Sequence, residues 1–139
     1  MKVIVCGAGQ VGTSIVRHLV LENNDVTVID QSAELIHKIS DSMDVKAMEG
    51  FASHPDILEA AGAEDADMII AVTYADEVNM VACQVAHSLF EVPTKIARVR
   101  HQSYLQPIWA DLFSSDNMPI DVIISPEMEV GRAISRRLH

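Results

Sequence analysis

Three glycines near the N-terminus have a spacing that could bind a diphosphate. They stand in the segment Gly7-Ala8-Gly9-Gln10-Val11-Gly12. In a turn from a strand into a helix, the first glycine permits the tight turn, the second lets a pyrophosphate approach the backbone, and the third lets the helix pack closely on the strand. The free N–H groups and the positive dipole end of the helix then attract the diphosphate without a lysine.

An acidic residue about 20 positions further on supplies the other half of such a site. Asp30 ends the apolar run Val26-Thr27-Val28-Ile29. A carboxylate at the carboxyl end of a strand can accept both hydroxyls of an adenosine ribose and repels a 2′-phosphate, which favours NAD over NADP. The alternative is a purely structural turn, in which Asp30 caps a helix that begins at Ser32.

The elements around these residues have the order of a dinucleotide-binding unit. Residues 2–6 form a short apolar, β-branched run, which is typical of a strand buried on both faces of a parallel sheet. Val11, Ile15 and Leu19 then recur at helical spacing, ahead of the second apolar run. The order of strand, glycine turn, helix, strand and acid is the context that makes the glycine spacing informative.

The rest of the chain continues the alternation of strands and helices. We expect further strands at 44–48, 67–73, 95–100 and 120–124, and further helices at 32–40, after Pro55, at 76–90, at 103–113 and from Ser125 onward. The strand at 44–48 is the less hydrophobic one, so we expect it at an edge. The run at 67–73 is the longest apolar run, so we expect it beside the first strand.

This alternation predicts one α/β domain over residues 1–139, with a Rossmann-like three-layer fold. Its six-stranded sheet is expected to be parallel, with right-handed crossovers and the strand order 3-2-1-4-5-6. The order reverses beside the first strand. The reversal places a crevice above the glycine turn, near Asp30, Thr73 and Arg98.

Several side chains of the helices have expected roles. Ser53 is expected to cap the short helix, with Pro55 at or near its first position. Asp76 and Glu77 open the long helix, where they favour its dipole. Trp109 is expected to pack within 103–113. The long helix is expected to bury Val78, Val81, Ala82, Val85, Ala86 and Leu89.

Two features near the C-terminal end leave alternatives open. Arg98 and Arg100 project from the same face of a strand end, where they contact ligand phosphate or an acidic neighbouring subunit, or form solvated edge charge. The last helix carries an apolar stripe that packs back on the sheet or meets a partner subunit or a following domain. The stripe consists of Val130, Ile134 and Leu138.

The composition excludes several classes of partner. The chain has 10 basic and 20 acidic residues, so its field repels nucleic acid and anionic lipid. No apolar stretch approaches the roughly 20 residues that span a bilayer, and the first element reads as a strand and not a signal peptide, so we expect a soluble intracellular protein without membrane insertion. Cys6 and Cys83 are expected to be reduced core residues, and the six histidines lack the pairing of a metal site.

Taken together, these segments resemble the TrkA N-terminal (RCK/KTN) domain family of potassium-transport regulators, over essentially the whole chain. The stretches that carry the resemblance are Gly7-Ala8-Gly9-Gln10-Val11-Gly12, Asp30, Gly50 with Ser53-His54-Pro55, Ala71-Val72-Thr73 followed by Asp76-Glu77 and Asn79, Ile96-Ala97-Arg98, and Ile124-Ser125-Pro126-Glu127.

The resemblance implies a cytoplasmic regulatory domain that is not an enzyme. Such a domain binds NAD or NADH, alternatively ADP or ATP, and its ligand-dependent conformation controls a membrane-embedded potassium transporter subunit on the inner face of the membrane. The resemblance also implies a homo-oligomer, a dimer or a higher ring, in which the last helix, 125–139, crosses to a partner subunit. Relatives continue into a ligand-sensing domain, so we expect the chain to be a fragment of a longer protein.

The resemblance also assigns residues to the nucleotide. It places the glycine segment at the pyrophosphate, Asp30 at the ribose, Thr73 on the nicotinamide side and Arg98 at the mouth of the crevice. Many relatives carry an acid after the glycine that is Gly50 here, whereas this chain has Phe51, so that contact is expected to pass to Ser53. The full set is Gly7, Ala8, Gly9, Gln10, Val11, Gly12, Asp30, Gln31, Ser53, Thr73 and Arg98.

Two other functions share part of this pattern. The cofactor half of an NAD-dependent dehydrogenase has the same glycine turn, but it needs a substrate domain and a positioned acid or base, and no such pair stands out here. A methyltransferase that uses S-adenosylmethionine shares the early glycines and the ribose acid but leaves Gly12 poorly explained. A nucleotide sensor needs neither a substrate domain nor a positioned acid or base, because unequal affinity of the nucleotide for two conformations is sufficient.

Overall fold

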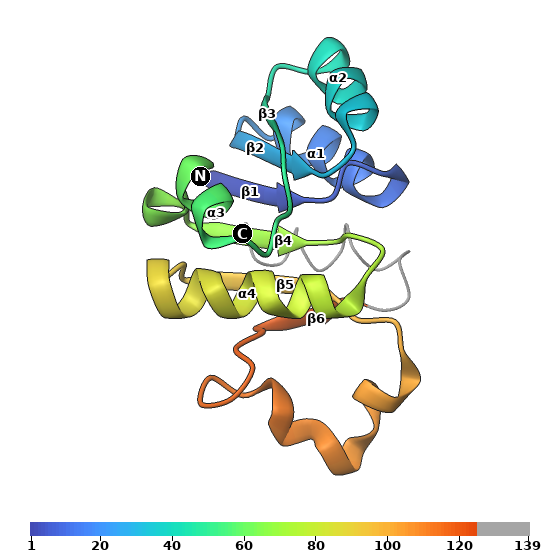
Figure 1. The fold of residues 1–139 in the computed structure, drawn as a ribbon, viewed down its shortest axis with the longest axis vertical. Helices are drawn as coiled ribbons and strands as arrows, with labels where there is room; N and C mark the ends of the chain where they lie inside the picture. Colours follow the sequence, from blue (N-terminus) through green and yellow to red (C-terminus); the bar gives the residue numbers. More distant parts are fainter. Residues whose placement is uncertain (125–139) are drawn as a thin grey trace.

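A six-stranded parallel sheet forms the centre of the computed structural model, which describes residues 1–124 (Figure 1). The strand order is β3-β2-β1-β4-β5-β6, which confirms the predicted topology. The strands are β1 (Lys2–Cys6), β2 (Asp25–Asp30), β3 (Lys46–Glu49), β4 (Met68–Ala71), β5 (Thr94–Arg98) and β6 (Val122–Ile124). The sheet order places β1 and β4 in the middle and β3 at an edge, as their hydrophobicity indicates.

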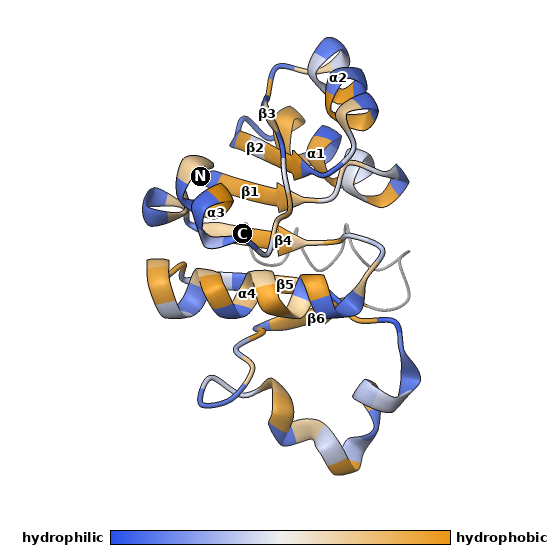
Figure 2. Cartoon of the chain, viewed as in Figure 1, coloured by the Kyte–Doolittle hydropathy of each residue, from blue (hydrophilic) through white to orange (hydrophobic). Residues whose placement is uncertain are grey.

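Helices cover both faces of this sheet. They are α1 (Gln10–Leu21), α2 (Ala33–Ser42), α3 (Pro55–Ala60) and α4 (Asp76–Phe90), with the shorter 3₁₀ helices η1 (Ala63–Asp65), η2 (Gln102–Leu105) and η3 (Pro107–Phe113). Val3 and Val5 of β1 pack in the core on the α1 and α2 side, whereas Ile4 and Cys6 pack in the core on the α3 and α4 side. The inner strands are therefore hydrophobic along their length, as Figure 2 shows.

The segment predicted as one helix at 103–113 is two 3₁₀ helices instead. Pro107 causes the break, because a proline drives the preceding residue out of the helical region, and Gln106 is extended with φ −66° and ψ 134°. In Figure 1 this connection extends beyond the β5–β6 edge of the sheet. Trp109, which was expected to pack, is 55% exposed there.

The prediction for the buried face of α4 is wrong at two positions. Val81 and Leu89 are 44% and 60% exposed. Asn79 and Cys83 are buried in their place, while Ala82 and Ala86 point inward as predicted. The apolar pattern misled because the buried face includes a polar residue, Asn79, which a count of apolar positions assigns to the solvent side.

Two cysteines lie in the core without a disulfide. Cys6 and Cys83 are buried and free, as expected. Burial raises the pKa of both thiols, that of Cys83 to about 12, so both stay neutral in the folded protein.

The C-terminal segment and the length of the helices bear on two further predictions. The predicted last helix, 125–139, and its apolar stripe lie outside the described residues. Within residues 1–124 no helix has the length and apolar composition that crossing a bilayer requires.

Candidate nucleotide site

The glycine turn connects β1 to α1 at the carboxyl edge of the sheet. Gly7 has φ +116°, and a Cβ on it would lie 2.9 Å from the carbonyl oxygen of Val72, so this position requires glycine. Its N–H donates to the carbonyl oxygen of Ile29 at 2.8 Å. The turn is therefore fixed between the ends of β2 and β4.

The other two glycines differ in what surrounds them. A Cβ on Gly12 would overlap the carbonyl oxygen of Gly7, so close packing of α1 on the turn needs the bare backbone there, as predicted. A Cβ on Gly9 would meet no atom within 4 Å. Gly7 and Gly12 are thus required by the packing of the protein itself, whereas Gly9 borders open space that a ligand could enter.

The N-terminus of α1 has no negative side chain of its own. Gly9 is its N-cap, no side chain caps it, and its first turn contains no acid. The first turns of the other three α-helices within residues 1–124 each contain an acid, for example Glu34 in α2 and Asp56 in α3. The positive end of the α1 dipole therefore faces the crevice without a local carboxylate, which suits an anion.

Asp30 joins the glycine turn to the loop after β2. Its Oδ2 accepts a hydrogen bond from the Ala8 N–H at 2.8 Å, and its Oδ1 accepts one from the Ser32 N–H at 2.8 Å. The N-cap of α2 is Ser32, whose hydroxyl accepts from the Leu35 N–H at 3.2 Å, so Asp30 is not the cap that the alternative interpretation required. A carboxylate with one bond on each oxygen retains lone pairs for hydroxyl donors.

A buried asparagine holds the opposite side of the crevice. The side chain of Asn79 in α4 is fully buried. Its Oδ1 accepts from the N–H of Thr73 at 2.9 Å and from its hydroxyl at 2.7 Å, while its Nδ2 donates to the carbonyl oxygens of Thr73 at 3.1 Å and Arg98 at 2.8 Å. One amide therefore ties the ends of β4 and β5 together.

The two acids at the start of α4 bind the segment that follows β5. The carboxylate of Asp76 accepts from the N–H groups of Arg100 at 3.0 Å and His101 at 2.8 Å. The Tyr104 hydroxyl donates to Glu77 Oε2 at 2.9 Å. These contacts add a positional role to the expected interaction with the helix dipole.

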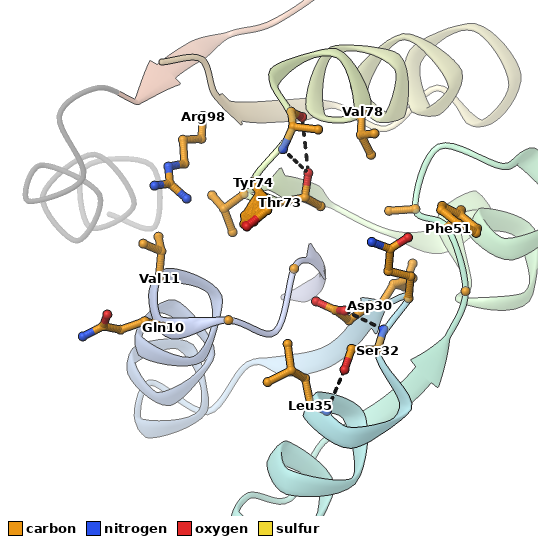
Figure 3. A pocket seen from close by; sticks show the side chains of 18 of the residues that line it. Gln10, Val11, Asp30, Ser32, Leu35, Phe51, Thr73, Tyr74, Val78 and Arg98 are labelled. Atoms are coloured by element: carbon orange, nitrogen blue, oxygen red, sulfur yellow. Dashed lines mark hydrogen bonds between the residues drawn. The ribbon is translucent and has the colours of Figure 1, made fainter. Parts of the chain in front are cut away.

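Arg98 and Arg100 bring positive charge to one end of the crevice. Burial lowers the pKa of Arg98, and the neighbouring charge of Arg100 lowers it further. In Figure 3 the Arg98 side chain extends from β5 on the same side as Gln10 and Val11, away from Phe51. The carboxylate of Asp76 acts in the opposite direction on the pKa of Arg98. Two guanidinium groups at this end of the crevice are able to bind a phosphate or carboxylate group of a ligand.

A pocket of about 560 Å³ connects these elements, a size typical of small-molecule sites. Of the predicted contacts, it is lined by Gly7, Gly9, Gln10, Val11, Asp30, Gln31, Thr73 and Arg98. Three predicted contacts do not line it. The Ala8 N–H donates to Asp30, Gly12 packs against Gly7, and Ser53 is not among the lining residues.

The predicted cap of α3 is also wrong. His54, and not Ser53, is at the N-cap position, although Pro55 begins α3 as predicted.

Other lining residues were not among the predicted contacts. They are Ile29, Ser32, Leu35, Gly50, Phe51, Ala52, Val72, Tyr74, Ala75, Val78 and Arg100. Most of them directly follow β2, β3 or β4. Their position after the strands, at the carboxyl edge of a parallel sheet, is the signal that could have found them. Within residues 1–124 no group of histidine, cysteine, aspartate or glutamate side chains could hold a metal ion.

Comparisons with known proteins agree with this geometry, which is that of a Rossmann-type domain with its crevice at the strand reversal. The family model described as the TrkA-N domain matches residues 3–126. The chain belongs to the TrkA-N domain family.

Curated relatives share the sequence over almost all of this chain. The Trk system potassium uptake protein TrkA of Azorhizobium caulinodans is 59% identical over 99% of this chain and 30% of its own length. The protein of the same name from Halomonas elongata is 52% identical over 98% of this chain and 29% of its own length. The chain thus spans less than a third of the length of these two curated relatives.

Solved structures share the fold at low sequence identity. The TrkA-N domain of the inner membrane protein ybaL from Escherichia coli has a TM-score of 0.77 and 18% identity, covering 99% of this chain and 96% of that one. The GsuK channel bound to NAD has a TM-score of 0.73 and 19% identity over 96% of this chain and 23% of its own. GsuK bound to ADP has a TM-score of 0.70 and 19% identity, over 88% of this chain and 30% of its own.

Proposed function

We propose that this chain is the nucleotide-binding input of a regulatory protein of a potassium uptake system. The observation that carries the proposal is the pocket at the strand reversal, where Gly9 borders open space and Asp30 stands at the end of β2. The names of the curated relatives support the link to potassium uptake.

The proposed ligand is NAD or NADH, with ADP or ATP as the alternative. The diphosphate lies over Gly9 at the N-terminus of α1, the ribose hydroxyls bind Asp30, and the rest of the ligand extends past Thr73 toward Arg98. The two GsuK structures, one with NAD and one with ADP, support both ligand types for this fold. We propose no reaction at this site: among residues 1–124 Asp30 is the one carboxylate that lines the pocket, and its proposed role is to accept the ribose hydroxyls.

The proposed setting is the cytoplasmic face of the membrane. The domain assembles as a homodimer or a higher ring and regulates a membrane-embedded potassium transporter subunit, with nucleotide binding shifting the assembly between two conformations. A nucleotide can cause this shift only if it binds the two conformations with unequal affinity. Nucleic acid is not a proposed partner, because the net charge of −10 opposes it.

A thermal-stability panel tests nucleotide binding. NADH, NAD, ADP and ATP at millimolar concentration are each added to the purified chain, and the melting temperature is expected to rise, because a ligand that binds only the folded state stabilises it by RT ln(1 + [L]/Kd). NADPH is expected to raise it less than NADH, because Asp30 repels a 2′-phosphate. No shift with any of the four nucleotides would overturn the proposal.

Asp30→Ala and Asp25→Ala form a matched pair for the ribose contact, since Asp25 is an exposed residue at the opposite end of the same strand. Each variant is compared with its own ligand-free melting temperature. Asp30→Ala is expected to lose most of the nucleotide-dependent shift, and Asp25→Ala to keep it. Light scattering with and without nucleotide then tests assembly, and a monomer under all conditions would contradict the homo-oligomer.

A further inference from the structure

Phe51 is an exposed aromatic residue at the end of the pocket opposite Arg98 (Figure 3). It is 51% exposed and lines the pocket. Single exposed apolar residues are ordinary on protein surfaces, so exposure alone assigns nothing to it. Its position relative to Asp30 is the informative feature.

The strand order places Phe51 one step beyond the ribose acid. The strands β1, β2 and β3 are consecutive neighbours, and they end at the glycine turn, at Asp30 and at Glu49, respectively. Asp30 pairs with Glu49, and the Gly50 N–H donates to the Asp30 carbonyl oxygen at 2.9 Å. Because neighbouring strands lie about 4.8 Å apart, the end of β3 is about 10 Å from the glycine turn. Phosphate, ribose and base of one nucleotide would therefore lie over β1, β2 and β3 in turn.

The local structure supports the ring of Phe51. The imidazole of His54 stacks on the Phe51 ring, with 5.2 Å between the ring centroids and 29° between the planes. A Cβ on Gly50 would lie 2.8 Å from Ile57 Cδ1, so the backbone before Phe51 fits closely against α3. The neighbouring lining residues, Gly50 and Ala52, carry no polar side chain. The ring surface that His54 leaves open is thus suited to a flat aromatic group.

We propose that Phe51 is the platform on which the base of a bound purine nucleotide stacks, so that the site recognises the base by its aromatic face. This inference rests on the proposed function and assigns its base-recognition residue. Stacking of a base on an aromatic side chain typically contributes a 5- to 100-fold change in affinity, by order of magnitude.

Two substitutions at Phe51 test whether the aromatic ring is needed or only an apolar side chain, and a third at Tyr74 is the control. Phe51→Leu keeps an apolar side chain but removes the ring, Phe51→Tyr keeps the ring, and Tyr74→Ala removes the other exposed aromatic residue of the pocket, which follows β4. Affinity for AMP and for ribose 5-phosphate is measured by calorimetric titration. Phe51→Leu is expected to weaken AMP about 5- to 100-fold and to leave ribose 5-phosphate unchanged, while Phe51→Tyr binds AMP like the wild type.

A spectroscopic readout reports the contact directly. The chain has one tryptophan, Trp109, so Phe51→Trp in a Trp109→Phe background places the sole indole at the site. AMP is expected to quench its fluorescence by stacking, and ribose 5-phosphate is not. The melting temperatures of the ligand-free variants check that each one is folded.

The outcomes distinguish this inference from the proposed function. AMP affinity that is unchanged in Phe51→Leu, or lost in Tyr74→Ala instead, would overturn the Phe51 platform and leave nucleotide binding standing. A wild-type chain that binds no nucleotide at all would overturn the proposed function, and the base platform with it.

Discussion

The two sides of the pocket are built on opposite principles. The glycine side, residues 7–12, depends on missing side chains, because Gly7 and Gly12 have no room for a Cβ. The asparagine side, formed by the ends of β4 and β5 and the start of α4, depends on polar side chains that hold backbone groups in place. Asn79 is the central one of these.

The two sides of the pocket are therefore destabilised by different kinds of substitution. On the glycine side an added methyl group causes harm, and the remaining backbone N–H groups stay available for a ligand. On the asparagine side the loss of one amide leaves a buried carbonyl oxygen of Arg98 and two partly buried backbone groups of Thr73 without this partner. The first side is therefore specified by steric limits, and the second by hydrogen bonds.

The largest expected effect is on the glycine side, from Gly12→Ala. The new Cβ would overlap the carbonyl oxygen of Gly7, so α1 must move off the turn, and we expect a loss of about 3 kcal/mol or more in the free energy of unfolding. Gly9→Ala is the matched control, with no atom near its Cβ, and we expect a change within about 1 kcal/mol. Chemical denaturation measures both, and equal losses would contradict the steric account of this side.

The next largest effect is expected from Asn79→Ala. The substitution removes the partners of the Thr73 N–H and of the Thr73 and Arg98 carbonyl oxygens, at a cost of about 2–3 kcal/mol. Gln84→Ala is the control on the same helix, since that amide makes an exposed bond to Ser88, and its cost is expected to stay within about 0.5 kcal/mol. Denaturation curves in which the two variants coincide would show that the buried amide does not hold this side.

The same contrast explains how much could be predicted from the sequence. The strand order, the glycine turn and the position of Asp30 were predicted, because apolar runs and glycine spacing have few alternative explanations. The bonds of Asp76, Glu77 and Asn79 were missed. Such residues equally suit solvent or a helix start. The Arg98 carbonyl oxygen bound by Asn79 lies 19 residues away, and the partners of Asp76 and Glu77 lie 24 to 27 residues away.

The errors in the prediction follow from the same limit. Counting apolar positions put Val81 and Leu89 inside α4, because the rule has no place for a buried asparagine. Ser53 was expected to cap α3, yet His54 is at that position; of these residues Phe51, and not Ser53, lines the pocket. Which residue of a short turn faces a crevice depends on tertiary contacts, such as the fit of Gly50 against Ile57, that no local pattern contains.

A smaller effect is expected from Asp76→Ala. It removes the acceptor of the Arg100 and His101 N–H groups, and because these bonds are exposed we expect a loss of about 1 kcal/mol. Asp56→Ala removes a first-turn acid of α3 and tests the dipole contribution alone. Amide hydrogen exchange at Arg100 and His101 should accelerate in Asp76→Ala and not in Asp56→Ala. Unchanged exchange at these two amides would show that Asp76 acts only through the dipole of α4 and does not hold the segment after β5.

The smallest effect concerns the outer contact of the asparagine side, between Tyr104 and Glu77. The hydrogen bond to Glu77 holds the phenol in its neutral form and raises the pKa of Tyr104 above its ordinary value of 10.0. Stability from this contact is therefore fully present below that ordinary value and is lost as the pH rises through the raised one.

With Tyr74→Phe, Tyr104 is the sole tyrosine, so ultraviolet absorbance follows its titration. Adding Glu77→Gln is expected to lower this pKa toward the ordinary value, because the phenolate no longer faces a carboxylate. Identical titrations with and without Glu77 would show that the contact does not form in solution, and the asparagine side would then rest on Asn79 and Asp76.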